Sequence, residues 1–118
     1  MEAYFDRTNH PKVKIIVGGR KQKRLLIALL DTGFDGHLSI PINIAIQLGL
    51  ELVNVERVQY ADGRISSELV FAVNVEIDGK NQLIQATLTN SIEALAGTAL
   101  FSKNKVTFDF LRRKIIIT

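Results

Sequence analysis

The stretch "ALLDTGFDGHLSIP", residues 28 to 41, joins an apolar run to a turn that is rich in acids and glycine. The run from Leu25 to Leu30 has the composition of a buried β-strand. It ends in the triplet Asp31-Thr32-Gly33, and a second acid and glycine, Asp35-Gly36, follow at once. The stretch therefore predicts either an ordinary strand-to-turn junction or a carboxylate that is held at the mouth of a site.

Length and composition limit the class of protein. The chain has 118 residues, of which 47% are hydrophobic and 23% charged, and these values predict one globular domain over residues 1 to 118. It contains no cysteine, which excludes disulfides and thiolate chemistry. The first residues lack the apolar core of a signal peptide, and the longest apolar run, "LLIALL", is far shorter than a membrane span. We therefore expect a cytoplasmic protein with no membrane partner.

The positive charge is concentrated in two short basic segments. The net charge is +3, and the basic residues gather at 20 to 24 and at 112 to 114, each between two apolar runs. Such positions predict solvated hairpin turns. A nucleic-acid surface is the alternative, but no aromatic residue is interleaved with these segments to form a stacking platform. A nucleic-acid partner is thus not favoured.

The remaining pattern is mostly β. Residues 41 to 50 are the exception, because their apolar side chains recur at helical intervals, with Pro41 in the first turn, Ser39 as the candidate cap and Gly49 as the stop. The other segments predict strands and turns. They are a hairpin at 13 to 30, a hairpin around Asp62-Gly63, a strand over 69 to 77 with its return strand, a strand and short helix divided at Gly97, and a terminal hairpin around "LRRK".

Two motifs in this pattern resemble a known family. The first motif is Asp31-Thr32-Gly33, and the second is Leu95-Ala96-Gly97, an apolar step that also ends in glycine. The hairpin "YADGR", residues 60 to 64, lies between them. The chain from Val13 to Thr118 resembles the retropepsin-like aspartic proteases, which include retroviral proteases and their bacterial and cellular relatives. The resemblance implies a closed β-barrel of the acid-protease type with one middle helix and a short C-terminal helix.

The resemblance also implies a role for each matching residue. Asp31 would be the catalytic carboxylate, and Thr32 would join two such loops across a dimer axis. Gly33 would let the backbone pass close to a substrate, because it has no Cβ, and Gly97 would let the second turn pack beneath the loop. The other candidate substrate-binding residues follow the motif or form a flap that covers the substrate: Phe34, Asp35, Gly36, Tyr60, Ala61, Asp62 and Gly63.

Peptide hydrolysis by this route needs two carboxylates at one site. One is ionised and takes a proton from water, whereas the other is protonated and polarises the scissile carbonyl. Carboxylates held about 3 Å apart cannot both ionise, so their pKa values belong to the pair. Only Asp31 lies in the motif, so the second carboxylate would be Asp31 of another copy in a two-fold homodimer. The substrate would be an extended peptide or protein segment.

Asp35 has two interpretations that the sequence leaves open. The resemblance makes it a contact to the substrate backbone, and the alternative is a turn carboxylate that accepts backbone N–H bonds. A catalytic pair with Asp31 in the same chain is disfavoured, because the family places this acid outside the pair. The chain also departs from the retroviral pattern: Thr98 stands where those relatives usually carry an arginine that can pair with this acid, and the expected flap has a single glycine, Gly63.

Other features of the sequence complete the expectations. His10 and His37, the only histidines, lack metal-ligand spacing, so we expect neither a metal site nor a cofactor.

Residues 1 to 12 are expected to be a loosely ordered N-terminal arm. The tail from 114 to 118 is either a core strand or an edge strand that pairs with its two-fold mate. The expected lining of apolar substrate pockets is Phe34, Leu38 and Ile65.

The leading hypothesis is a homodimeric aspartic endopeptidase that hydrolyses peptide bonds through a water activated by the two Asp31 carboxylates. The alternative is a non-catalytic dimeric module of the same fold that binds peptides, because fold does not fix function. The intact Asp-Thr-Gly argues against this alternative, since a pure binder has no need of buried paired carboxylates.

Overall fold

The computed structural model describes all residues from Met1 to Thr118. They form ten strands, one α-helix and one 3₁₀ helix. Neither helix has the length and apolar composition required to cross a membrane. In chain order the elements are β1 (Glu2–Phe5), β2 (Pro11–Gly18), β3 (Lys23–Leu30), β4 (Leu38–Pro41), α1 (Ile42–Leu48), β5 (Glu51–Gln59), β6 (Ile65–Ile77), β7 (Lys80–Thr89), β8 (Ala94–Ala96), η1 (Thr98–Phe101), β9 (Val106–Asp109) and β10 (Lys114–Ile117).

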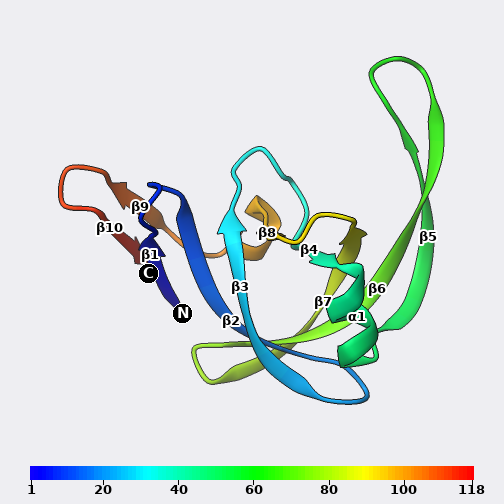
Figure 1. Cartoon of the computed structure of the whole chain (residues 1–118), viewed down its shortest axis with the longest axis horizontal. Helices are drawn as coiled ribbons and strands as arrows, with labels where there is room; N and C mark the ends of the chain where they lie inside the picture. The colour runs from blue at the N-terminus through cyan, green and yellow to red at the C-terminus, as the bar shows by residue number, and fades with distance from the viewer.

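Six of the strands close into a barrel (Figure 1). Their order is β6-β7-β4-β8-β3-β2, and a further pairing of β6 with β2 joins the two ends. The pairs β3–β8 and β4–β7 are parallel, and the other pairs in the barrel are antiparallel. The predicted fold class, a mostly β closed barrel with one middle helix and a short C-terminal helix, is confirmed.

The barrel interior holds a core of 17 buried apolar residues. Alternate residues of β2, and of β6 within the barrel, point inward, as a pleated strand requires. On β2 and β6, for example, Ile15, Val17, Val73 and Val75 are at most 1% exposed. The helix α1 adds Leu48, which is completely buried, to the same core.

The helix α1 ends as the sequence predicts but begins differently. Gly49 terminates it with φ of +71°, and its N–H donates to the carbonyls of Ala45 and Ile46, a C-terminal geometry that favours glycine. The residue before the helix is Pro41, and no side chain caps the first turn. The prediction of Ser39 as the cap is wrong. Ser39 is a buried residue of β4, where it is held in register with Leu95 and Thr87 on the neighbouring strands.

The two ends of the chain lie together beside the barrel (Figure 1). Residues 2 to 5, expected as part of a loose arm, form β1, which pairs with β2 at four positions. The tail forms β10, which lies between β1 and β9. This strand has no buried residue, so the core-strand interpretation of the tail is wrong, and pairing with a two-fold mate stays a prediction. The edge strand of this extension is β9.

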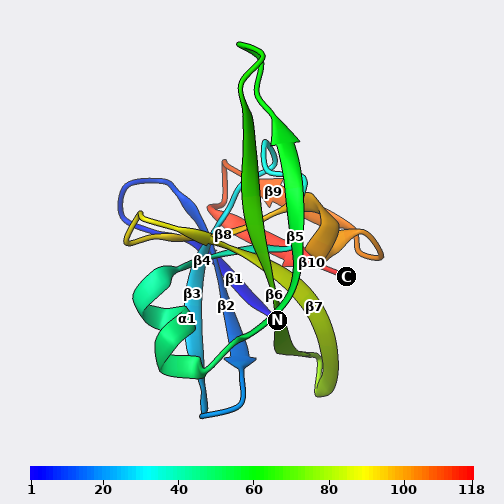
Figure 2. The ribbon, with the colours of Figure 1, turned by 90° about the vertical axis from the view of Figure 1, so that its right-hand side faces the viewer.

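The strands β5 and β6 form a long hairpin that projects beyond the barrel (Figure 2). At its tip the N–H of Tyr60 donates to the carbonyl of Arg64 at 2.8 Å, and the N–H of Gly63 donates to the carbonyl of Tyr60 at 3.0 Å. Gly63 has φ of +88°, a conformation that glycine adopts without a steric penalty. The hairpin predicted around Asp62-Gly63 is therefore confirmed.

A polar turn anchors β1 and β2 to the C-terminal hairpin. The Asp6 carboxylate accepts hydrogen bonds from the hydroxyl of Thr8 at 2.7 Å, the N–H of Thr8 at 2.8 Å and the N–H of His10 at 3.0 Å. The Arg113 guanidinium donates to the Asp6 carbonyl at 2.9 Å. The bond from the Thr8 hydroxyl, followed by the backbone bond from His10, lowers the pKa of Asp6 from 3.8 to about 2.

This lowered pKa predicts a dependence of stability on pH. The unfolded carboxyl binds a proton more readily than the folded one, so the contribution of Asp6 is present above pH 3.8 and is lost as the pH falls towards 2. Across this window the free energy of unfolding in urea should fall more steeply for the wild type than for Asp6→Asn. Glu76→Gln should keep the wild-type slope. Equal slopes for the wild type and Asp6→Asn would contradict the assignment.

Candidate active site

Asp31 begins the loop that joins β3 to β4. Its N–H donates to the Ala96 carbonyl of β8 at 3.0 Å, so the neighbouring strand fixes the position of the backbone. Its carboxylate accepts a hydrogen bond from the N–H of Gly33 at 2.9 Å, and its carbonyl accepts one from the N–H of Phe34 at 3.1 Å. The loop is therefore an Asp-centred turn. It holds a partly exposed carboxylate at the end of β3, a strand whose alternate residues Leu26, Ala28 and Leu30 are buried.

The turn between β8 and η1 packs directly beneath this loop. The N–H of Gly97 donates to the His37 carbonyl at 2.9 Å, and the N–H of Thr98 donates to the Phe34 carbonyl at 2.8 Å. Gly97 is buried, and a β-carbon on it would lie 2.2 Å from the Gly36 carbonyl oxygen and 2.6 Å from that of Phe34. No side chain fits there, so Gly97 acts through close packing. A direct contact of Gly97 with substrate stays a prediction.

Gly33 differs from Gly97 in its surroundings. It is exposed, and a β-carbon on it would meet only the Asp31 carboxylate, at 3.2 Å. Packing within the chain therefore leaves open space on this side of the loop. The neighbouring Thr32 is also exposed, and its hydroxyl makes no hydrogen bond within the chain.

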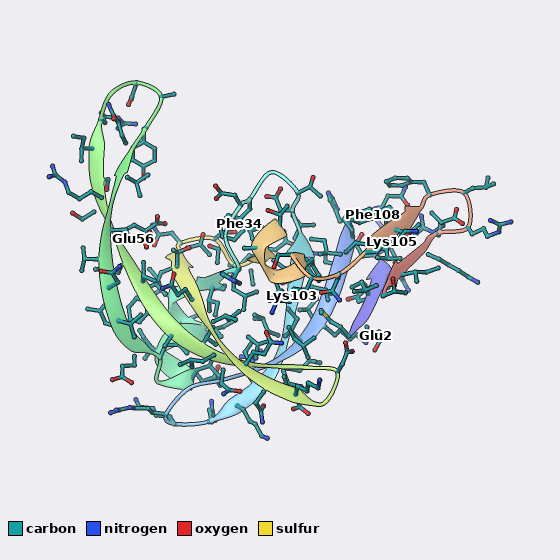
Figure 3. All side chains as sticks on the ribbon, turned by 180° about the vertical axis from the view of Figure 1, so that it is seen from behind. Glu2, Phe34, Glu56, Lys103, Lys105 and Phe108 are labelled. Carbon is teal, nitrogen blue, oxygen red and sulfur yellow. The ribbon has the colours of Figure 1, made fainter.

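Two hollows flank the loop. The first, of about 260 Å³, lies towards β9 and has mostly apolar walls, which include Leu30, Phe101, Val106 and Phe108; Asp31 is its only acid. The second, of about 160 Å³, lies between the loop and the projecting hairpin. Figure 3 labels one residue of each wall of the second hollow, Phe34 on the loop and Glu56 on β5, and also Phe108 of the first.

No protein-family model and no curated protein matches the chain, but solved structures do. A retropepsin-like aspartic protease from Rickettsia conorii superposes with a TM-score of 0.67 at 16% identity, over 98% of this chain and 86% of that one. The chain has the retropepsin-like fold. The EIAV protease, complexed with the inhibitor HBY-793, gives a TM-score of 0.58 at 14% identity, over 95% of this chain and 97% of that one. The simian foamy virus (mac) protease gives 0.54 at 12% identity, over 86% and 98%.

Within this retropepsin-like fold the expected flap residues lie far from the Asp31 loop. Tyr60, Ala61, Asp62 and Gly63 form the exposed tip of the β5–β6 hairpin and line neither hollow. Figures 1 and 2 both show this tip standing clear of the loop. The structure thus confirms the hairpin but does not bring its tip together with Asp31, so substrate contacts by these residues stay a prediction.

The expected pocket residues have different outcomes. Phe34 lines the second hollow, and its ring covers Gly36 and Gly97. Leu38 also lines the second hollow, although it is only 1% exposed and belongs to the barrel core. Ile65 lies on the hairpin, exposed, and lines neither hollow.

Asp35 and Thr98 do not contact each other through an ion pair, because residue 98 is not an arginine. Asp35 is exposed and forms no ion pair within the chain, and it lines the second hollow. Thr98 binds the Phe34 carbonyl through its N–H at 2.8 Å and its hydroxyl at 3.4 Å. The second turn is therefore joined to the loop by neutral hydrogen bonds rather than by an arginine–aspartate pair.

Sequence reasoning missed several residues of the second hollow, and the two acids among them are Glu56 and Glu68. They lie equally far from Asp62 on either side of the hairpin turn and are paired in the ladder. Counting outward from the predicted turn would have placed them opposite each other. It would not have shown that they face the loop, because the face of a projecting hairpin is set by how it leaves the barrel.

Gly97→Ala should destabilise the protein, because its methyl group would overlap the carbonyls of the Asp31 loop. Overpacking of this kind lowers the free energy of unfolding by about 1–3 kcal/mol, and urea denaturation would measure it. Gly33→Ala is the matched control and should lose much less, since only the Asp31 carboxylate borders its β-carbon. Equal losses for the two variants would show that the Gly97 contact is not tight.

Proposed function

We propose that this protein is an aspartic endopeptidase that acts as a homodimer, with one Asp31 from each copy in the active site. The observation that carries the proposal is the Asp31-Thr32-Gly33 turn at the end of β3, in a retropepsin-like fold, with its carboxylate beside open space. The substrate is an extended peptide segment that adds backbone hydrogen bonds like a further strand.

A single chain supplies only half of the chemistry. One ionised Asp31 carboxylate takes a proton from a water, whose oxygen then attacks the carbonyl carbon of the scissile bond. The second Asp31, protonated, donates a hydrogen bond to the carbonyl oxygen. A proton then passes to the amide nitrogen as the carbon–nitrogen bond breaks. Asp31 is the only acid that lines the hollow around it, so a second copy provides the other carboxylate.

Three features of the surface near Asp31 support a dimer. The first hollow presents apolar side chains next to a charged group, and exposed apolar surface of this kind indicates an interaction site. The neighbouring β9 is an edge strand with a free side. The exposed hydroxyl of Thr32 has no partner within the chain. A second copy placed across this face would cover the hollow and bring the two Asp31 side chains together.

Asp31→Asn should abolish cleavage while preserving the fold. The asparagine oxygen can still accept the Gly33 N–H bond, but the amide can neither take nor give the catalytic proton. The rate should fall by at least about 10²-fold, measured by mass spectrometry of a diverse peptide library at acidic to neutral pH. Circular dichroism and sedimentation serve as controls for fold and dimer. Wild-type cleavage by the variant would contradict the assignment, and no cleavage by either protein would favour the binding module.

The dimer requirement predicts how activity responds to mixing. Activity per chain should fall on dilution as dimers dissociate. An excess of Asp31→Asn chains added to wild type should lower activity further, because mixed dimers hold a single carboxylate. The same excess of wild-type chains is the matched control and should raise activity. A rate that is linear in wild-type protein and unaffected by Asp31→Asn chains would mean that one chain suffices.

A further inference from the structure

The hollow between the Asp31 loop and the β5–β6 hairpin has an unusual charge. Its walls carry three carboxylates, Asp35 from the loop, Glu56 from β5 and Glu68 from β6, and neither lysine nor arginine. His37 is the only other titratable side chain that faces it. The ion pairs of the chain all involve other carboxylates. This hollow is therefore an acidic region in a chain whose net charge is +3.

The stability of the β5–β6 hairpin does not explain the negative charge of the hollow. Glu56 and Glu68 are directly opposite each other in the β5–β6 ladder, and like charges in that position destabilise a strand pair. Glu56 is exposed on β5 and Glu68 is half-buried on β6, and neither belongs to the apolar core. Arg57 is the cation nearest to Glu56 in the sequence. Its side chain lies on the other face of the hairpin, because successive residues of a strand point to opposite faces. The negative charge thus lacks a counter-charge within the chain.

The hollow is continuous with the loop that carries Asp31. Phe34 lines it, and the N–H of Phe34 donates to the Asp31 carbonyl at 3.1 Å. The other apolar residues of its walls are Leu38, Val70 and Ala86, which lie beside the carboxylates. The carboxylates do not converge as metal ligands do. Apolar walls beside separated carboxylates fit a long side chain with a cationic end, which packs its methylene stem on those walls and pairs its charge.

We infer that this hollow is the subsite for a lysine or arginine side chain of the substrate, with Glu56 and Glu68 as the residues that determine specificity. The inference rests on the proposed endopeptidase function and names its substrate class. A basic side chain relieves the repulsion between the two glutamates. A neutral side chain leaves that repulsion in place, and an acidic one adds to it. Substrates are therefore peptides with a basic residue at one fixed position near the scissile bond.

The first experiment compares peptides that differ at one position at a time and carry lysine, glutamine or glutamate there. At one position the wild type should cleave the lysine peptide about tenfold faster, in kcat/KM, than the glutamine peptide. The Glu56→Gln, Glu68→Gln double variant should lose this preference and cleave the lysine and glutamine peptides with equal kcat/KM. Glu76→Gln, on the same strand but outside the hollow, should keep it. Efficient cleavage without a basic preference, or a preference that survives in the double variant, would overturn the inference.

Reversing the charge of one glutamate tests the subsite, because the loss of a purely structural residue would not change which peptide is preferred. Glu68→Lys should shift the preference at the same position from lysine towards glutamate. Binding of the same peptides to Asp31→Asn, measured by fluorescence anisotropy, separates the subsite from catalysis. Tighter binding of lysine peptides that depends on Glu56 and Glu68 would support the subsite even if the wild type cleaved nothing, in which case only the endopeptidase proposal would fail. Equal binding of the lysine and glutamine peptides would overturn the subsite.

Discussion

The close packing of two turns at Gly97 is the constraint on which the candidate site depends. The turn after β8 runs so near the Asp31 loop that a β-carbon on Gly97 would lie 2.2 Å from a carbonyl oxygen of that loop. Hydrogen bonds from the N–H groups of Gly97 and Thr98 hold the two turns together. Because the loop rests on this layer, Asp31 keeps a fixed position even though it lies at the exposed end of a strand.

The strand β8 brings the two turns together. It has only three residues, yet it lies between β3 and β4 in the barrel, parallel to one and antiparallel to the other. Its inward residues Ala94 and Ala96 are small and almost completely buried, which lets the strand sit close to the core. The register that pairs Leu30 with Ala96 puts the ends of β3 and β8 at the same level. Asp31 and Gly97 follow directly, so the barrel itself aligns the two motifs.

The two hollows on either side of the Asp31 loop differ in chemistry. The one towards β9 has apolar walls and is the proposed contact with another copy of the chain, whereas the one towards the hairpin is acidic and is the inferred subsite for a basic side chain. The β5–β6 hairpin produces this contrast. Beyond the barrel it no longer needs an apolar inner face, so charged residues there do not disturb the core.

The sequence by itself determined the features that depend on local chemistry. These include the turns at Gly49 and Gly63, whose positive φ favours glycine, the alternation that marks the strands, and the Asp31 motif at the end of an apolar run. Features that depend on pairing between distant segments required the tertiary structure. Ser39 belongs to a strand because β7 and β8 flank it, and residues 2 to 5 are ordered because β2 and β10 pair with them. The acidic hollow is of the same kind, since Asp35, Glu56 and Glu68 meet only where the hairpin leaves the barrel beside the loop.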